Sequence, residues 1–121
     1  MILIDNISFD EESREADVVL KSKNECIKCY CHPVENIKEV FESINNSLSA
    51  FAVDNIIVDD GAIPQVIKSN AGYYSYYLKG RVISAKQIQI NDFIIDVGPI
   101  PKDIKIGEYV SCHCLRLDIL I

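Results

Sequence analysis

The sequence contains no hydrophobic run that could span a bilayer. Its longest unbroken apolar stretches have three or four residues, whereas a membrane helix needs about 20. The first residues, MILIDNISFDEE, also lack the basic segment that begins a secretory signal. We therefore expect a cytoplasmic protein that does not insert into membranes. Thiols stay reduced in that compartment, and five cysteines are an odd number for a disulfide framework.

Basic residues are scarce. Twelve Lys and Arg stand against eighteen Asp and Glu, which gives a net charge of −6. Such a charge repels phosphate backbones and so disfavours a general nucleic-acid binder. The charge is uneven, however: residues 1–65 hold thirteen acids and five bases, whereas residues 66–121 hold five acids and seven bases. The net negative charge therefore argues only in part against nucleic-acid binding, because the second half could form a locally basic face.

Signatures of common catalytic sites are also missing. The sequence has no serine elbow, no HExxH and no Walker loop. Cys31-His32 and Cys112-His113 are neighbours in sequence, but neighbours on a strand point to opposite faces, so neither pair is expected to act as nucleophile and base. Asp59-Asp60-Gly61 is explained as a turn after a strand. We therefore expect a non-enzymatic protein that needs no cofactor.

The composition favours one compact β-rich domain. Hydrophobic residues make up 49% of the chain and charged residues 25%, which excludes disordered and coiled-coil classes. Twenty Ile and ten Val favour strands. A chain of 121 residues fits one domain, and we find no linker or repeat, so residues 1–121 are predicted to form a single domain.

Hydrophobic patterning predicts the elements. Ser22-Lys23-Asn24 predicts a turn, Asn91-Asp92 a two-residue hairpin, and Gly80 a bulge or tight bend within a long strand. Residues 62–72 look irregular. Apolar alternation predicts strands at 2–9, 16–21, 25–32, 51–58, 73–85, 87–90, 93–97 and 108–120.

One helix is predicted after the third strand. The capping-box-like spacing of Asn36 and Glu39 indicates its start, and Asn45-Asn46-Ser47 weakens its end. A helix of about three turns would place five apolar residues along one stripe: Ile37, Val40, Phe41, Ile44 and Leu48.

This order, three meandering strands, a helix and then further strands, resembles the oligonucleotide/oligosaccharide-binding (OB) barrel, whose helix commonly follows the third strand. The segment Ile104 to Val110, IKIGEYV, resembles the turn that opens the last strand of many small β-barrels. The resemblance implies a mainly β fold, an antiparallel OB-like barrel of about six to eight strands with one helix. It implies no functional residue.

The cysteines and histidines gather in two short runs. In strands, Cys29 and Cys31 would share a face, as would Cys112 and Cys114. If the third and last strands were adjacent and in register, these four thiols could form a zinc site, which leaves a small structural zinc protein as an alternative. We expect instead that all four are buried, reduced core residues without metal.

The tyrosine-rich stretch YYSYY suggests two faces of one strand. Tyr74, Tyr76, Leu78 and Val82 are expected in the core. The opposite face would carry two aromatic and two cationic residues, Tyr73, Tyr77, Lys79 and Arg81. That set is explained by β propensity, by a protein interface, or by stacking on single-stranded nucleic acid. In the final strand, Arg116 and Asp118 are expected to pair.

Two functions follow. The first is a protein-binding module, of the kind seen in small acidic inhibitor or immunity proteins, whose acids meet a basic partner. The alternative is an OB-like single-stranded nucleic-acid-binding domain that uses the tyrosine and cation face. Self-association is left open. The acidic interface candidates are the residues 10–12 and the helical residues Glu35, Glu39 and Glu42.

Overall fold

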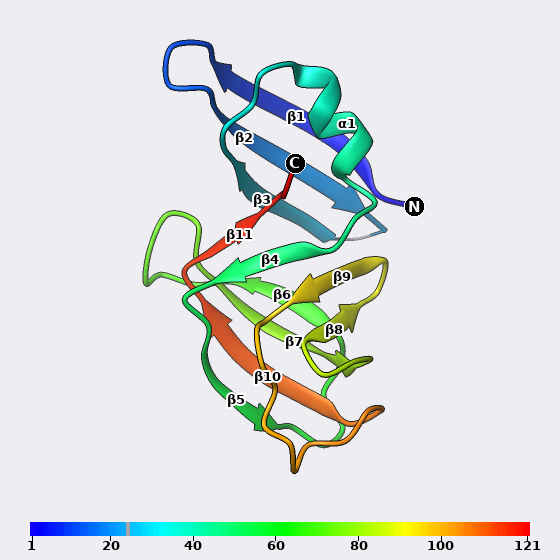
Figure 1. Cartoon of the computed structure of the whole chain (residues 1–121). Helices are drawn as coiled ribbons and strands as arrows, with labels where there is room; N and C mark the ends of the chain where they lie inside the picture. The colour runs from blue at the N-terminus through cyan, green and yellow to red at the C-terminus, as the bar shows by residue number, and fades with distance from the viewer. Residues whose placement is uncertain (24) are drawn as a thin grey trace.

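The computed structural model describes residues 1–23 and 25–121, so Asn24 of the predicted Ser22–Asn24 turn lies outside the described residues. Strands account for 50% of the structure and the helix for 6% (Figure 1). The predicted mainly β class is confirmed, as is the position of the helix after the third strand.

In chain order, the elements that the structure describes are β1 (Leu3–Asp10), β2 (Glu15–Ser22), β3 (Glu25–Cys31), α1 (Ile37–Ser43), β4 (Leu48–Phe51), β5 (Asp54–Val58), β6 (Gln65–Lys68), β7 (Tyr76–Val82), β8 (Gln87–Ile90), β9 (Phe93–Asp96), β10 (Tyr109–Cys114) and β11 (Arg116–Asp118).

The first three strands form the predicted antiparallel meander. β1 pairs with β2 and β2 with β3, and alternate residues of β2 and β3 are buried. The helix α1 follows and begins at the predicted capping box: the Asn36 side chain accepts a hydrogen bond from Lys38 N, and Asn36 N donates to Glu39 Oε1. The helix ends at Ser43, earlier than predicted, and its Val40 is buried whereas Phe41 is exposed.

Two long predicted strands are each interrupted. The strand predicted at 51–58 is β5 and the last residue of β4, separated by a backbone with positive φ at Ala52. The rest of β4 is a correction, because Leu48 was predicted on the helical stripe and lies instead in this strand. The strand predicted at 108–120 is β10 and β11, separated by Leu115, whose N–H donates to Phe51 O. The two interruptions therefore lie beside each other. They let β11 pair with β4 while β10 pairs with β5 and β7.

The sheet differs from the predicted antiparallel barrel of six to eight strands. It contains eleven strands within the described residues, in the order β1-β2-β3-β11-β4-β9-β8-β7-β10-β5, with β6 on β7. It is mixed, because β11 runs parallel to β3 and β4 runs parallel to β9. It is not closed, since its outer strands β1 and β5 do not pair. The extra strands come from the two interruptions and from β6, which lies in the segment expected to be irregular.

Gly80 lies where β7 changes partner along one edge. Residues 76–79 of β7 pair with β6, whereas Arg81 and Val82 pair with β8, and β10 occupies the other edge throughout. A Cβ atom at Gly80 would lie 2.8 Å from the Gln89 carbonyl oxygen. The glycine therefore allows the β8 backbone to approach β7 closely at the bend.

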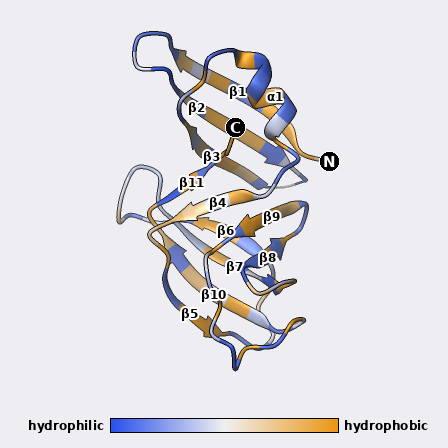
Figure 2. Ribbon diagram, viewed as in Figure 1, coloured by the Kyte–Doolittle hydropathy of each residue, from blue (hydrophilic) through white to orange (hydrophobic). Residues whose placement is uncertain are grey.

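The core is one cluster that draws residues from the meander, the helix and the later strands. Figure 2 shows the alternating bands of apolar and polar residues that place one face of most strands in this cluster. Its largest fully buried side chains include Phe93, Leu20, Ile27, Leu78 and Leu117. In the described part of the chain, no helix has the length and apolar character needed to cross a membrane.

Candidate interaction surface

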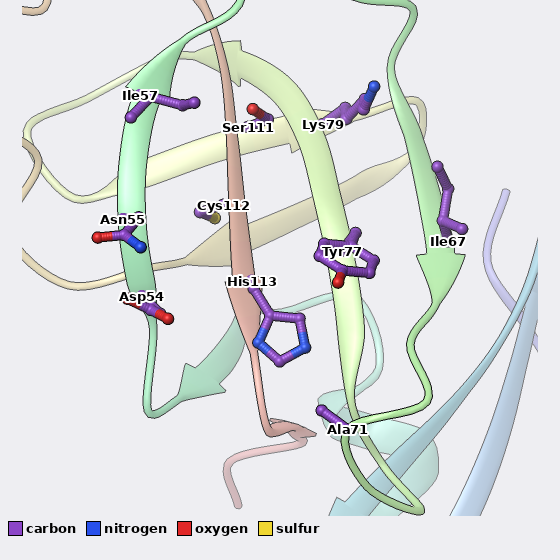
Figure 3. Close-up of a pocket in the computed structure, with 10 residues that line it drawn as sticks. All are labelled: Asp54, Asn55, Ile57, Ile67, Ala71, Tyr77, Lys79, Ser111, Cys112 and His113. Carbon is purple, nitrogen blue, oxygen red and sulfur yellow. The ribbon is translucent and has the colours of Figure 1, made fainter.

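The outer face of β5, β10, β7 and β6 carries an open groove of about 550 Å³, hereafter the groove (Figure 3). Each of the four strands contributes side chains, and the loop after β6 closes one end. The groove is lined by Asp54, Asn55, Ile57, Ile67, Ala71, Tyr77, Lys79, Ser111, Cys112 and His113.

The apolar side chains of the groove are exposed because of strand alternation. In β7, Tyr76, Leu78 and Val82 point into the core as predicted, so Tyr77 points outwards and is 51% exposed. Tyr74, also predicted in the core, precedes β7 and is only partly buried. On β5, Ile57 is 58% exposed. Large apolar side chains gathered in a concavity, with nothing covering them, are typical of a contact surface.

Polar groups lie at both ends of the groove. At one end, His113 Nε2 and Ser69 Oγ lie 2.8 Å apart and share a hydrogen bond, and the His113 ring lies 4.8 Å from the Tyr77 ring. Asp54 is the strand partner of His113 on β5. At the other end, Lys79 Nζ lies 3.8 Å from Asp59 Oδ2. The lysine charge is therefore offset by an acid.

The loop between β6 and β7 is organised around Lys68. Its ammonium donates to the carbonyl oxygens of Ser69, Gly72 and Ser75 at 2.5, 2.7 and 3.1 Å. The same three carbonyl oxygens also accept bonds from Ser69 N, Ser75 N and Ser75 Oγ, so the loop is held by its own hydrogen-bond network. The loop in turn positions Ala71 at the rim of the groove.

Of the four residues predicted to share one face, Tyr77, Lys79 and Arg81 share the outer face of β7, and Tyr73 does not. Tyr77 and Lys79 line the groove. Tyr73 precedes β7, in the loop, where Lys28 Nζ donates to its hydroxyl and lies 4.2 Å from its ring centroid. Arg81 is exposed near the end of β7, beside Tyr109 and Gln89 of the neighbouring strands. The alternation prediction holds from Tyr76 onwards, where the strand begins.

Helix α1, which contains Glu39 and Glu42 and follows Glu35, lies away from the groove and beside the meander (Figure 1). Glu35 is exposed and pairs with Arg14. Glu39 uses its carboxylate in the capping box. Glu42 is exposed on α1. Two of these three acids therefore have internal partners, and their role in an interface stays a prediction.

A second concavity, which is acidic, includes Asp10 and Glu11 of the acidic candidates 10–12, although the sequence did not indicate a cleft there. A cleft of about 480 Å³ is lined by Asp10, Glu11, Glu15 and Asp17, together with Ser8, Phe9, Tyr30 and Tyr74. Tyr30 Oη donates to Glu15 at 2.7 Å, and Tyr74 Oη donates to Asp17 at 2.6 Å. The bond to Glu15, helped by burial, raises the pKa of Tyr30 to about 12. Only the register of Asp17 with Tyr30 and the fold of the 69–75 loop bring these groups together.

Beside this cleft, the predicted pair of Arg116 and Asp118 is confirmed. Arg116 Nε donates to Asp118 Oδ1 at 2.6 Å, and Arg116 Nη2 donates to Asp118 Oδ2 at 3.0 Å. The Arg116 guanidinium lies between two rings, 4.6 Å from the Tyr30 centroid and 4.7 Å from that of Phe51. The pair orders the polar face where β3, β11 and β4 meet.

The predicted burial of four cysteines is confirmed: Cys29, Cys31, Cys112 and Cys114 are buried, whereas Cys26 is exposed. Burial raises the pKa of Cys31 to about 11 and that of Cys112 to about 12. The strand neighbours of β3 are β2 and β11, not β10, so the two cysteine pairs do not face each other across one ladder. Among the described residues, no group of three or more His, Cys, Asp or Glu side chains could hold a metal ion.

This burial predicts selective thiol chemistry. In the native protein at mildly alkaline pH, Ellman's reagent should react quickly with Cys26 alone, because only an exposed thiol with an accessible thiolate is a good nucleophile. The four buried thiols should react only as the protein unfolds, so that all five react quickly in guanidinium. A Cys26→Ser variant should lose the fast phase. A fast phase of two or more thiols would contradict this placement.

We compared the chain with protein-family models, with curated proteins and with solved structures, and it matches none of them.

Proposed function

We propose that the protein is a non-enzymatic binding module, acting in the cytoplasm, whose groove binds a basic protein. The observation that carries the proposal is the concave apolar surface formed by Tyr77, Ile57 and Ile67 on the outer face of the sheet. Tyrosine is enriched at interfaces because one rigid ring supplies a large contact area and a polar end. Ile57 and Tyr77 supply the exposed apolar area that such a contact buries.

Charge supports a basic partner. The chain carries a net charge of −6. At the groove itself, Asp54 is exposed and Lys79 is offset by Asp59, and Asp60, in the turn after β5, is also exposed. The acidic cleft adds four carboxylates on another part of the surface. A positively charged protein would therefore be steered towards this molecule, and its association rate should fall as salt rises.

The structure supplies less support for the nucleic-acid alternative. Single-strand binders combine stacking rings with a basic groove that follows the phosphates. Here Lys28 lies on the Tyr73 ring, and the groove contains one lysine, which is already close to an acid. We therefore keep single-stranded nucleic acid as an outcome of the experiment rather than as the proposed ligand.

The proposal predicts a groove-dependent capture. The native protein, immobilised and incubated with lysate of its source cells, should retain a basic protein at low salt and less of it at moderate salt. The double variant Ile57→Ser/Tyr77→Ser should retain at least tenfold less of that protein, because it removes two exposed side chains that carry most of the apolar contact. Quantitative mass spectrometry of the bound fraction measures both results.

A matched control removes equally exposed apolar residues elsewhere. Leu3 and Ile106 are 55% and 69% exposed and lie outside the groove, so Leu3→Ser/Ile106→Ser should behave like the native protein. The proposal fails if no protein distinguishes the groove variant from this control. It also fails if the groove-dependent material is nuclease-sensitive, which would support the nucleic-acid alternative.

A further inference from the structure

β5 offers an unpaired backbone edge beside the groove. It is the last strand in the sheet order, and within residues 1–23 and 25–121 no strand pairs with its outer edge. Asp59 N donates to Tyr109 O, and the register pairs Ile57 with Ser111. In an antiparallel ladder, bonded and non-bonded residues alternate, so Ile57 directs its backbone groups towards β10. Val58, which lies between Ile57 and Asp59, therefore directs its N–H and C=O groups outwards.

The protection of this edge against pairing is confined to its two ends, which leaves Ile57 and Val58 open between them. Natural edge strands are protected by charges, prolines or bulges. Both outer strands have a register shift and carry acids: β1 shifts between Ile4 and Asn6, and β5 shifts between Asp54 and Ile57. In β5 the irregularity lies earlier, near Asn55, and the stretch that follows is apolar, with Ile57 and Val58 both exposed. Ile57 and Val58 thus combine exposed apolar side chains with a free backbone edge at Val58.

We propose that an extended segment of the basic partner adds to this edge as a further strand beside β5 and places its apolar side chains over Ile57 in the groove. The inference rests on the proposed function, since it names the mode in which that partner binds. Strand addition of this kind takes affinity from main-chain hydrogen bonds and specificity from alternate side chains.

The charges around β5 select the occupant. Asp54 and Asp60, near the two ends of the strand, are exposed, and Asp59 is matched by Lys79. An added strand that carries lysine or arginine would meet these carboxylates. A second copy of this chain would instead bring another net charge of −6, together with the same acids at its own β5. Charge complementarity therefore favours a basic segment over self-pairing.

The test uses a short strand-forming probe, fluorescein-labelled Lys-Val-Lys-Val-Lys-Val-Lys with blocked ends. Fluorescence anisotropy at low salt should show that this probe binds to the native protein. The same peptide with glutamate in place of every lysine should bind at least tenfold more weakly. Two further probes carry N-methyl groups on the valines or on the inner lysines. Because alternate N–H groups of a strand face the same edge, one of these probes should bind at least tenfold more weakly and the other about as well as the parent.

A pair of variants tests the same edge on the protein. Val58→Pro removes an outward N–H, which an edge strand tolerates, whereas Val58→Ala keeps the N–H and shortens the side chain. Val58→Pro should weaken probe binding about tenfold and Val58→Ala about twofold or less.

Equal effects of the two variants, equal binding of the two N-methylated probes, or no binding of the parent probe would each overturn strand addition. If Val58→Pro does not fold, the binding of the two N-methylated probes to the native protein still tests strand addition. If groove-dependent capture persists when strand addition fails, the proposed function stands.

Discussion

Replacing Gly80 by alanine should destabilise the protein by about 2–3 kcal/mol, as overpacking of a close contact does. The added Cβ would lie 2.8 Å from both the Gln89 carbonyl oxygen and Ile90 Cγ1, and 3.3 Å from the Gln89 carbonyl carbon. Two of these atoms belong to the backbone of β8, which cannot rotate away as a side chain could. Chemical denaturation, followed by far-UV circular dichroism, measures the change in the free energy of unfolding.

Gly72→Ala is the matched control. A Cβ at Gly72 would have only ordinary contacts, the nearest being Ser75 Oγ at 3.8 Å. The substitution should therefore change stability by less than about 1 kcal/mol, since it mainly restricts the unfolded chain. Similar stabilities of the Gly80→Ala and Gly72→Ala variants would show that β7 and β8 do not approach each other as closely as described here.

Replacing Leu117 by alanine should cost about 2–5 kcal/mol, the range for a leucine removed from a packed core. Leu117 is 0% exposed and lies on β11, the strand between β3 of the meander and β4 of the later strands. A cavity there removes apolar contacts where the two parts of the sheet meet. We expect thermal unfolding to remain a single transition with a lower midpoint, because the core is one cluster.

Leu115→Ala provides the comparison two residues away. Leu115 is half-exposed at the interruption between β10 and β11. Its truncation should therefore cost less than about 1 kcal/mol by the same measurement. If Leu117→Ala were as mild as Leu115→Ala, or if it produced two separate transitions, β11 would not join the two parts of one core.

Local signals predicted the elements well. Asn91-Asp92 lies between β8 and β9, which end and begin where the alternation predicts, and Asn91 has the positive φ that such a turn requires. The Asn36 capping box could be predicted for the same reason, since its hydrogen bonds join residues two and three positions apart. The meander followed from short polar connections between alternating segments.

Long-range pairing could not be read in the same way. Two parallel pairings, β11 with β3 and β4 with β9, join segments far apart in sequence, and alternation does not specify which strands are neighbours. The short strand β6 was hidden by Pro64 and by the polar residues after it. The interruptions near Ala52 and Leu115 became visible only through the contact between them.

The candidate surface was predicted in part. Alternation correctly placed Tyr77 and Lys79 on an outer face, but it extended the strand to Tyr73, which lies in the loop held by Lys68. His113, Ile57 and Ile67 were not anticipated as partners of Tyr77, because they reach the groove from three other strands. The acidic cleft was missed because it requires the register of β2 with β3.

The most direct test of groove binding is the affinity of the captured basic protein, once purified, for three proteins of equal stability: the native chain, Ile57→Ser/Tyr77→Ser and Leu3→Ser/Ile106→Ser. Isothermal titration calorimetry measures each dissociation constant at one salt concentration. We expect the groove variant to bind at least tenfold more weakly and the control to bind within about twofold of the native chain. Equal affinities for all three would contradict binding through the groove.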